Sequence, residues 1–197
     1  RHQAGIGRMT FDDHLPGYRG TLSRNAVTIA EVLKESGYAT SMVGKWHIAE
    51  TPLRKDQREW LAHHVYHETY SDLCHYPVNR GFDTHYGTIY GVVDYFDPFS
   101  LVEGEVPVKE VPDGYYITQA LSDRAVKEVK EYAKDDKPFF MYLAYTAPHW
   151  PLHALPEDIE KYKDTYKVGW EAIRNARYER QKQLGIFPNM DNFLSDR

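Results

Sequence analysis

The stretch that decides the fold is Gly37-Tyr38-Ala39-Thr40-Ser41-Met42-Val43-Gly44-Lys45-Trp46-His47. It opens with a glycine suited to the left-handed conformation that ends a helix, and it continues with aromatic, β-branched and apolar residues typical of a strand. A lysine and a histidine follow that run at once. The sequence therefore predicts a strand over residues 38–43, with two ionisable side chains directly after its carboxyl end.

A helix is expected just before this strand. Thr28-Ile29-Ala30-Glu31 has the pattern of a capping box, in which the threonine hydroxyl and the glutamate carboxylate each accept a hydrogen bond from a backbone amide of the first turn. Ile29, Val32 and Leu33 fall on one face at helical spacing. We expect a helix that starts after Thr28 and that Gly37 closes.

The same order of helix, loop and strand occurs again further along. Phe139-Phe140-Met141-Tyr142-Leu143-Ala144 is an apolar run between Pro138 and Pro148, which predicts a strand buried on both faces. Before it, a helix over about residues 116–134 is indicated by apolar residues at intervals of three and four: Ala120, Leu121, Val126, Val129 and Tyr132. The alternation predicts an α/β fold with a mainly parallel sheet flanked by helices, in which ligands bind past the carboxyl ends of the strands.

The remaining segments carry weaker patterns. Residues 77–111 are rich in glycine, aspartate, proline and aromatics, and they predict loops with a short hairpin around Glu103-Gly104. Residues 158–167 and 169–183 predict two exposed amphipathic helices. No repeat or low-complexity linker divides the chain, so a single incomplete domain is the simplest expectation.

The composition excludes several classes of protein. Of the 197 residues, 42% are hydrophobic and 27% are charged, which is ordinary for a globular domain. The formal charge of -5 comes without any run of lysine or arginine, so we expect no nucleic-acid partner. No segment approaches the roughly 20 apolar residues of a membrane-spanning helix. Cys74 is the single cysteine, which excludes an internal disulfide.

Polar side chains follow both predicted parallel strands. Lys45 and His47 come after the first, and His149 comes after the second, in the stiff segment Thr146-Ala147-Pro148-His149-Trp150-Pro151. A lysine at such a place stabilises negative charge, and a histidine moves a proton near neutral pH. The alternative is that these histidines are structural. The sequence thus predicts an anion-binding catalytic site from Lys45, His47 and His149.

Residues 37–47 resemble the second signature of the sulfatase family. This family belongs to the alkaline phosphatase-like superfamily of α/β enzymes. Further segments resemble the same family in the same order: Arg80-Gly81-Phe82-Asp83, Tyr86-Gly87, Lys137-Pro138-Phe139-Phe140 and Ala147-Pro148-His149-Trp150-Pro151-Leu152. The resemblance is closest to bacterial arylsulfatases. It implies an enzyme that hydrolyses sulfuric esters, with an aryl or a carbohydrate sulfate as substrate, in the periplasm or cytoplasm of a bacterium.

The resemblance also implies a role for each site residue. Lys45 matches the lysine that contacts sulfate and formylglycine, His47 matches the histidine that assists the formylglycine hydroxyls, and His149 matches the histidine beside the scissile sulfate. Sulfatases use formylglycine, made from cysteine or serine, and a divalent cation, usually Ca²⁺. The sequence around Cys74 lacks the family's modification pattern, because no proline or arginine stands where the pattern requires it.

The family's metal ligands are also not matched convincingly. Asp12-Asp13 and Asp191-Asn192 lack the strand and glycine context of the family, and we interpret both as solvated loop residues. We therefore expect residues 1–197 to be part of a sulfatase catalytic domain that lacks its N-terminal nucleophile and metal segment and its C-terminal portion. Such a chain is expected to be inactive alone, with Ca²⁺ and formylglycine bound outside it.

Two alternative functions and the role of one histidine cluster stay open at this point. A phosphonate or phosphate ester hydrolase of the same superfamily would place a phosphoryl group in the same pocket. A non-catalytic relative would only bind anions or sulfated sugars. His63, His64 and His67 also form a cluster in which His63 and His67 share a helical face, so they are candidates for a transition metal, for the substrate entrance or for a solvated surface.

Overall fold

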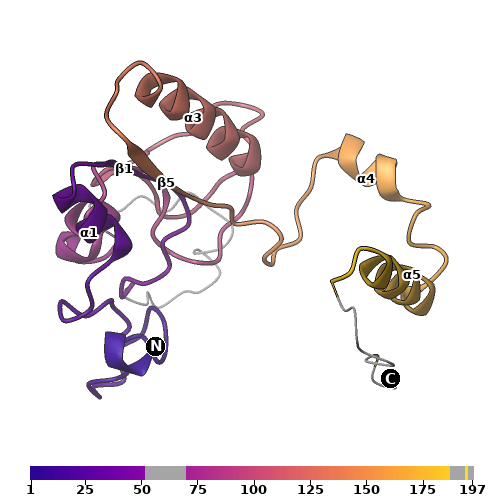
Figure 1. Ribbon diagram of the computed structural model, residues 1–197, viewed down its shortest axis with the longest axis horizontal. Coiled ribbons are helices and arrows are strands. Elements are labelled where there is room, and N and C mark those ends of the chain that lie inside the picture. The colour runs from indigo at the N-terminus through magenta and orange to yellow at the C-terminus, as the bar shows by residue number, and fades with distance from the viewer. Residues whose placement is uncertain (52–69, 187–193, 195–197) are drawn as a thin grey trace. The chain divides into compact units, whose positions relative to one another are not determined.

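One sheet organises the first part of the protein, in a computed structural model that describes residues 1–51, 70–186 and 194 (Figure 1). In those residues the strands are β1 (Ala39–Gly44), β2 (Thr84–Thr88), β3 (Leu101–Glu103), β4 (Val106–Pro107) and β5 (Phe139–Ala144). Their order in the sheet is β4-β3-β2-β1-β5. β1 is parallel to β2 and to β5, whereas β3 and β4 are antiparallel additions at one side. The expected α/β fold with a mainly parallel sheet is confirmed.

The chain divides into two compact units, Arg1–His153 and Ala154–Arg197. The first unit contains the sheet, the helices α1 (Ile29–Glu35) and α3 (Ile117–Tyr132), and the short turns η1 (His2–Ala4), η2 (Leu73–His75) and η3 (Pro77–Asn79). The second contains α4 (Pro156–Tyr162) and α5 (Trp170–Gln183), which are exposed along most of their length, as predicted. Among the described residues, each helix is too short or too polar to span a lipid bilayer.

Local sequence rules determine the ends of α1. The Thr28 hydroxyl accepts from the Glu31 amide at 3.0 Å, and the Glu31 carboxylate accepts from the Thr28 amide at 2.7 Å, so the predicted capping box is confirmed. Gly37 follows the helix with φ 88°, as expected of the residue that closes it. The predicted apolar face is wrong, because Ile29 and Val32 are exposed and Ala30 is the buried residue.

The helices α3 and α1 both contact β1, which Figure 1 shows between them. Ser41 bonds through its hydroxyl to Glu128 of α3, and Glu128 also accepts from Arg124 at 2.5 Å. The buried stripe of α3 is Ile117, Leu121, Ala125 and Glu128. The helix was predicted, but its inward face is rotated from the predicted stripe, since Val126 and Val129 are exposed.

Strand β5 differs from its prediction in burial. Its bounds are those expected, but Phe139, Tyr142 and Leu143 are 38%, 49% and 37% exposed, so it is not buried on both faces. The physical reason is its place at the edge of the sheet, where β1 is its single strand neighbour among the described residues. β5 is therefore an apolar edge strand.

The strand β2 was not predicted, whereas the hairpin of β3 and β4 around Glu103-Gly104 was. Thr84-His85-Tyr86-Gly87-Thr88 carries no apolar run, and although threonine and tyrosine favour strands, a histidine and a glycine interrupt them in this short segment. Its position comes from pairing: Ser41 lies opposite Thr84 and Val43 opposite Tyr86. The tertiary partner decides the structure of this segment.

Arg80 joins the segment before β2 to the start of the chain. It is 1% exposed, and its guanidinium donates to the carbonyls of Leu22 at 2.7 Å and Ala26 at 2.7 Å and to the Glu31 carboxylate at 3.0 Å. Three residues later, Asp83 accepts from the amide of Thr40 at 2.9 Å. Arg80-Gly81-Phe82-Asp83 thereby fixes α1 and β1 to one another.

Replacing Arg80 by methionine is expected to lower the free energy of unfolding of the chain by about 3 to 5 kcal/mol, because buried carbonyls and a carboxylate lose their donor. Arg24 is the matched control, since it also donates to two carbonyls, those of Cys74 and Asn79, but is exposed. Arg24→Met should cost about 1 kcal/mol or less. Urea unfolding measures both, and equal losses would contradict the anchoring role of Arg80.

Candidate active site

The carboxyl end of β1 continues into a turn that is bound to the neighbouring strands on both sides. The amide of Lys45 donates to Ala144 of β5 at 2.8 Å. The next two amides turn to the other side, where Trp46 donates to Thr88 at 2.9 Å and His47 to Ile89 at 3.0 Å. The backbone that carries Lys45 and His47 is therefore held by β5 and by the end of β2.

Two glycines allow the strands to meet here. A Cβ atom on Gly44 would lie 1.9 Å from the carbonyl oxygen of Ala144, and one on Gly87 would lie 1.9 Å from the carbonyl oxygen of Gly44. Gly44 also has φ 122°, which side chains rarely adopt. No other residue type fits either position without separating the strands.

His47 has a strained backbone and a partly buried, closely packed ring. Its φ is 63°, in the left-handed region that few residues other than glycine adopt. The ring packs directly over Gly91, where a Cβ atom would lie 2.2 Å from Nε2, and the ring of Tyr90 meets it edge to face at 6.0 Å between centroids. The orientation of this imidazole is thus set by the segment that follows β2.

His149 belongs to the loop after β5 and is exposed. Its amide donates to the carbonyl of Thr146 at 3.0 Å, and its own carbonyl accepts from the buried hydroxyl of Tyr95 at 2.7 Å. The peptide bonds before Pro148 and Pro151 are cis. Tyr95 therefore ties the His149 loop to the same segment that contacts His47.

Two of the predicted site residues, Lys45 and His149, lie within electrostatic reach of the third, His47. Burial is the largest cause that lowers the pKa of His47 to about 4, and the nearby charges of Lys45 and His149 also contribute to this lowering. Burial also lowers the pKa of Lys45, which is half-buried. The structure thus brings together an ammonium and two imidazoles at adjacent strand ends, and their role in catalysis stays a prediction.

The described residues do not fit a calcium ion. Calcium is bound by six to eight oxygen ligands. Among residues 1–51 and 70–186, the one group with metal-ligand spacing is Asp72, Cys74 and His75, which offers nitrogen and sulfur beside one carboxylate. Asp12 accepts from Arg19 at 3.1 Å and Asp13 from Arg8 at 2.9 Å, in agreement with solvated loop residues. His63, His64, His67 and the pair Asp191-Asn192 lie outside the described residues.

Sequence reasoning missed the residues that hold the two histidines, Tyr90, Gly91 and Tyr95. They follow β2, and because that strand was not predicted, its carboxyl end could not be searched. The pair Tyr90-Gly91 was visible as a signal, since a glycine close to a strand end allows close packing of another group. That group could be identified only from the structure.

The lowered pKa of His47 predicts how the stability of the fold depends on pH. Unfolded histidines gain a proton near pH 6.5, whereas folded His47 gains one near pH 4. Between these values the unfolded state binds more protons, so stability falls as the pH falls. NMR titration of the ring should give a midpoint near 4, and His47→Gln should reduce the pH dependence of unfolding in this window. A midpoint near 6.5 would contradict the enclosed ring.

Comparison with known proteins agrees with this architecture. The sulfatase family model matches residues 2–196. The chain is 29% identical to an uncharacterised sulfatase of Schizosaccharomyces pombe over 95% of its length, and 31% identical to an arylsulfatase of Klebsiella aerogenes over 93%. It covers 34% and 38% of those proteins, so it spans little more than a third of the relatives' length.

Solved structures show the same likeness. The crystal structure of Ps i-CgsB in complex with k-i-k-neocarrahexaose matches with a TM-score of 0.56 and 31% identity, over 73% of this chain and 31% of that one. The chain belongs to the sulfatase family.

Proposed function

We propose that the protein that contains this chain hydrolyses sulfuric esters, and that Lys45, His47 and His149 form part of its sulfate pocket. The observation that carries the proposal is the meeting of one ammonium and two imidazoles at the ends of β1 and β5. Positively charged and proton-transferring groups are what a sulfate ester needs, because negative charge develops on oxygen as the ester bond breaks.

Each residue has a physical task in this proposal. Lys45 neutralises charge on the sulfate oxygens, and its half-buried position strengthens that interaction because less water screens it. The low pKa of His47 keeps its ring neutral at pH 7, so it can accept a proton. His149, on an exposed loop, is placed to contact the alcohol side of the ester.

Ca²⁺ and formylglycine belong to the proposal through the family, which generally uses both. The described residues do not provide the oxygen ligands for such an ion, so we propose that the ligands and the modified nucleophile come from other parts of the protein. Residues 1–197 would then be a central part of the catalytic domain. Without those parts, the chain alone is expected to release no sulfate.

An aryl or carbohydrate sulfate is the proposed substrate class. Arylsulfatase of Klebsiella aerogenes and Ps i-CgsB, solved with k-i-k-neocarrahexaose, are among the relatives. Trp150 adjoins His149 and is 56% exposed, which offers a flat apolar surface for an aromatic or sugar ring. Neither class of ring is favoured over the other by this surface.

Replacing Lys45 by alanine in the whole protein is expected to reduce kcat for an aryl sulfate by roughly 10²- to 10³-fold, the usual loss when one charge-stabilising donor is removed. Lys34→Ala is the matched control, because Lys34 pairs with Asp83 on the surface at 2.7 Å. It should leave kcat within about twofold. Release of sulfate and of the alcohol is measured together.

Two results would contradict the proposed function. One is a Lys45→Ala enzyme as active as the Lys34→Ala control. The other is a whole protein that cleaves a phosphonate ester faster than the matching sulfate ester, which would assign it to the other branch of the superfamily.

Replacing Gly91 by alanine is expected to lower kcat at least about tenfold, because the new Cβ would displace the His47 ring and small displacements of catalytic groups are costly. Gly114→Ala, where a Cβ meets open space, is the control for backbone strain. If Gly91 acts through His47, adding Gly91→Ala to His47→Gln should cause little further loss. Additive losses would show that Gly91 acts elsewhere.

A further inference from the structure

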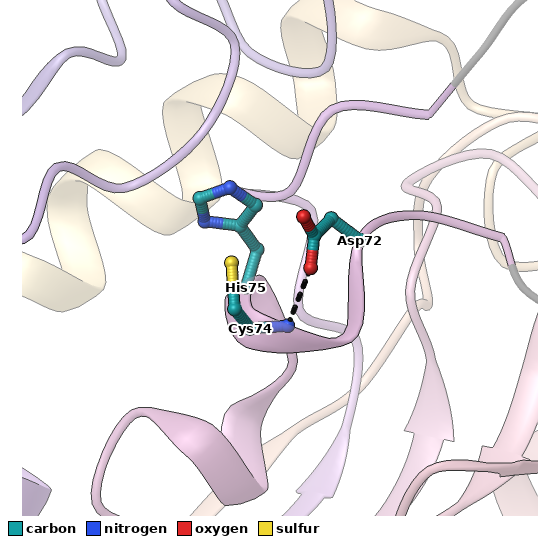
Figure 2. A group of neighbouring side chains, drawn as sticks. All are labelled: Asp72, Cys74 and His75. Atoms are coloured by element: carbon teal, nitrogen blue, oxygen red, sulfur yellow. Dashed lines mark hydrogen bonds between the residues drawn. The ribbon is translucent and has the colours of Figure 1, made fainter.

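Cys74 lies in a cluster of possible metal ligands that the proposed sulfate pocket does not use. Asp72, Cys74 and His75 belong to the short turn η2 and its first flanking residue, and one ligand atom from each lies within 4.8 Å of the others. Figure 2 shows the His75 ring near the sulfur of Cys74, with the Asp72 carboxylate beside them and bonded to the Cys74 amide. One helical turn therefore presents sulfur, nitrogen and oxygen donors to a common region.

This donor set selects a particular kind of ion. Thiolate and imidazole ligands suit zinc and similar transition metals, whereas calcium and magnesium prefer oxygen alone. In a tetrahedral zinc site the ligand atoms are about 3.3 to 3.8 Å apart, from metal distances of about 2.0 to 2.3 Å. The three ligand atoms already lie within 4.8 Å of one another, so side-chain movements of about 1 Å would bring them to those separations.

The side chains have free capacity for such an ion. Nδ1 of His75 is buried and has no hydrogen-bond partner among the described residues, although such nitrogens are normally satisfied. Oδ1 of Asp72 accepts from the Cys74 amide at 2.9 Å, which leaves the second carboxylate oxygen for a metal. Cys74 is half-buried, so solvent and ions can reach its thiol.

The backbone of the turn is held by side chains from outside it. The Trp46 indole donates to the carbonyl of His75 at 2.8 Å, Arg24 to the carbonyl of Cys74 at 2.8 Å and Asn79 to the carbonyl of Leu73 at 2.8 Å. These bonds fix the positions from which the ligands project, so an ion would meet a partly preorganised site. The positive charge of Arg24 opposes a cation at this turn, whereas the negative charge of the Asp72 carboxylate attracts one.

We infer that Asp72, Cys74 and His75 bind one zinc ion, with water in the fourth position. The inference rests on the convergence of three ligand types on one fixed turn and on the unpartnered Nδ1 of His75. It is independent of the proposed sulfatase activity, because none of the three residues belongs to the proposed sulfate pocket.

The test is titration of the full chain with Zn²⁺ in a thiol-free buffer, and with Co²⁺ as a spectroscopic probe. We expect one Zn²⁺ per chain and, with Co²⁺, the charge-transfer absorption of a thiolate ligand. Cys74→Ala should abolish that absorption, and both Cys74→Ala and His75→Gln should weaken zinc binding at least about tenfold. Circular dichroism of the metal-free variants shows that they are folded.

Matched controls separate this site from other histidines. His14→Gln removes an imidazole that also lies beside a carboxylate, that of Asp12, without a cysteine nearby, and it should leave binding unchanged. A triple variant, His63→Gln, His64→Gln and His67→Gln, should likewise keep the thiolate signal. Loss of zinc binding in the triple variant with retention in Cys74→Ala would overturn the inference, as would a cobalt complex without thiolate absorption.

Discussion

The contact between the backbones of Gly44, Ala144 and Gly87 is the constraint on which the rest of the structure depends. A single Cβ at Gly44 or Gly87 would collide with a neighbouring carbonyl at 1.9 Å, so three strand ends can meet only because two of them carry no side chain. That approach fixes where β1 stops and therefore where Lys45 and His47 begin. The positions of the proposed catalytic residues Lys45 and His47 therefore depend on neighbouring glycines that have no side chain.

The two proposed catalytic histidines are held in different ways by one segment. His47 is enclosed, with its ring over Gly91 and a backbone that few residues adopt. His149 is exposed, and the Tyr95 hydroxyl holds its carbonyl rather than its ring. The first arrangement keeps an imidazole neutral and oriented, whereas the second leaves an exposed imidazole whose Nδ1 lies 2.6 Å from the carbonyl oxygen of Trp150. The segment after β2 thus packs against the ring of one histidine and holds the backbone of the other.

Sequence patterns predicted what local rules determine. The capping box at Thr28 and the apolar run before Ala144 gave two elements with nearly correct bounds, and the strand-end rule led to Lys45, His47 and His149. β2 escaped prediction because its residues take their conformation from β1, and Gly91 escaped with it. The exposure of β5 could not be read from its apolar composition, since burial depends on neighbours that a linear pattern does not contain.

The register of the sheet has a consequence for the order in which the protein folds. Ala39 pairs with Phe139 and Gly44 with Ala144. The pairing of β1 with β5 can therefore form only after a strand 100 residues later in the chain has been made. Arg80, which anchors α1, is also made 49 residues after its partner Glu31. The entropy of closing such loops rises slowly with their length, but contacts of long range slow folding. During synthesis, α1 can form early from its own cap, whereas the pocket can be assembled only after β5 has left the ribosome.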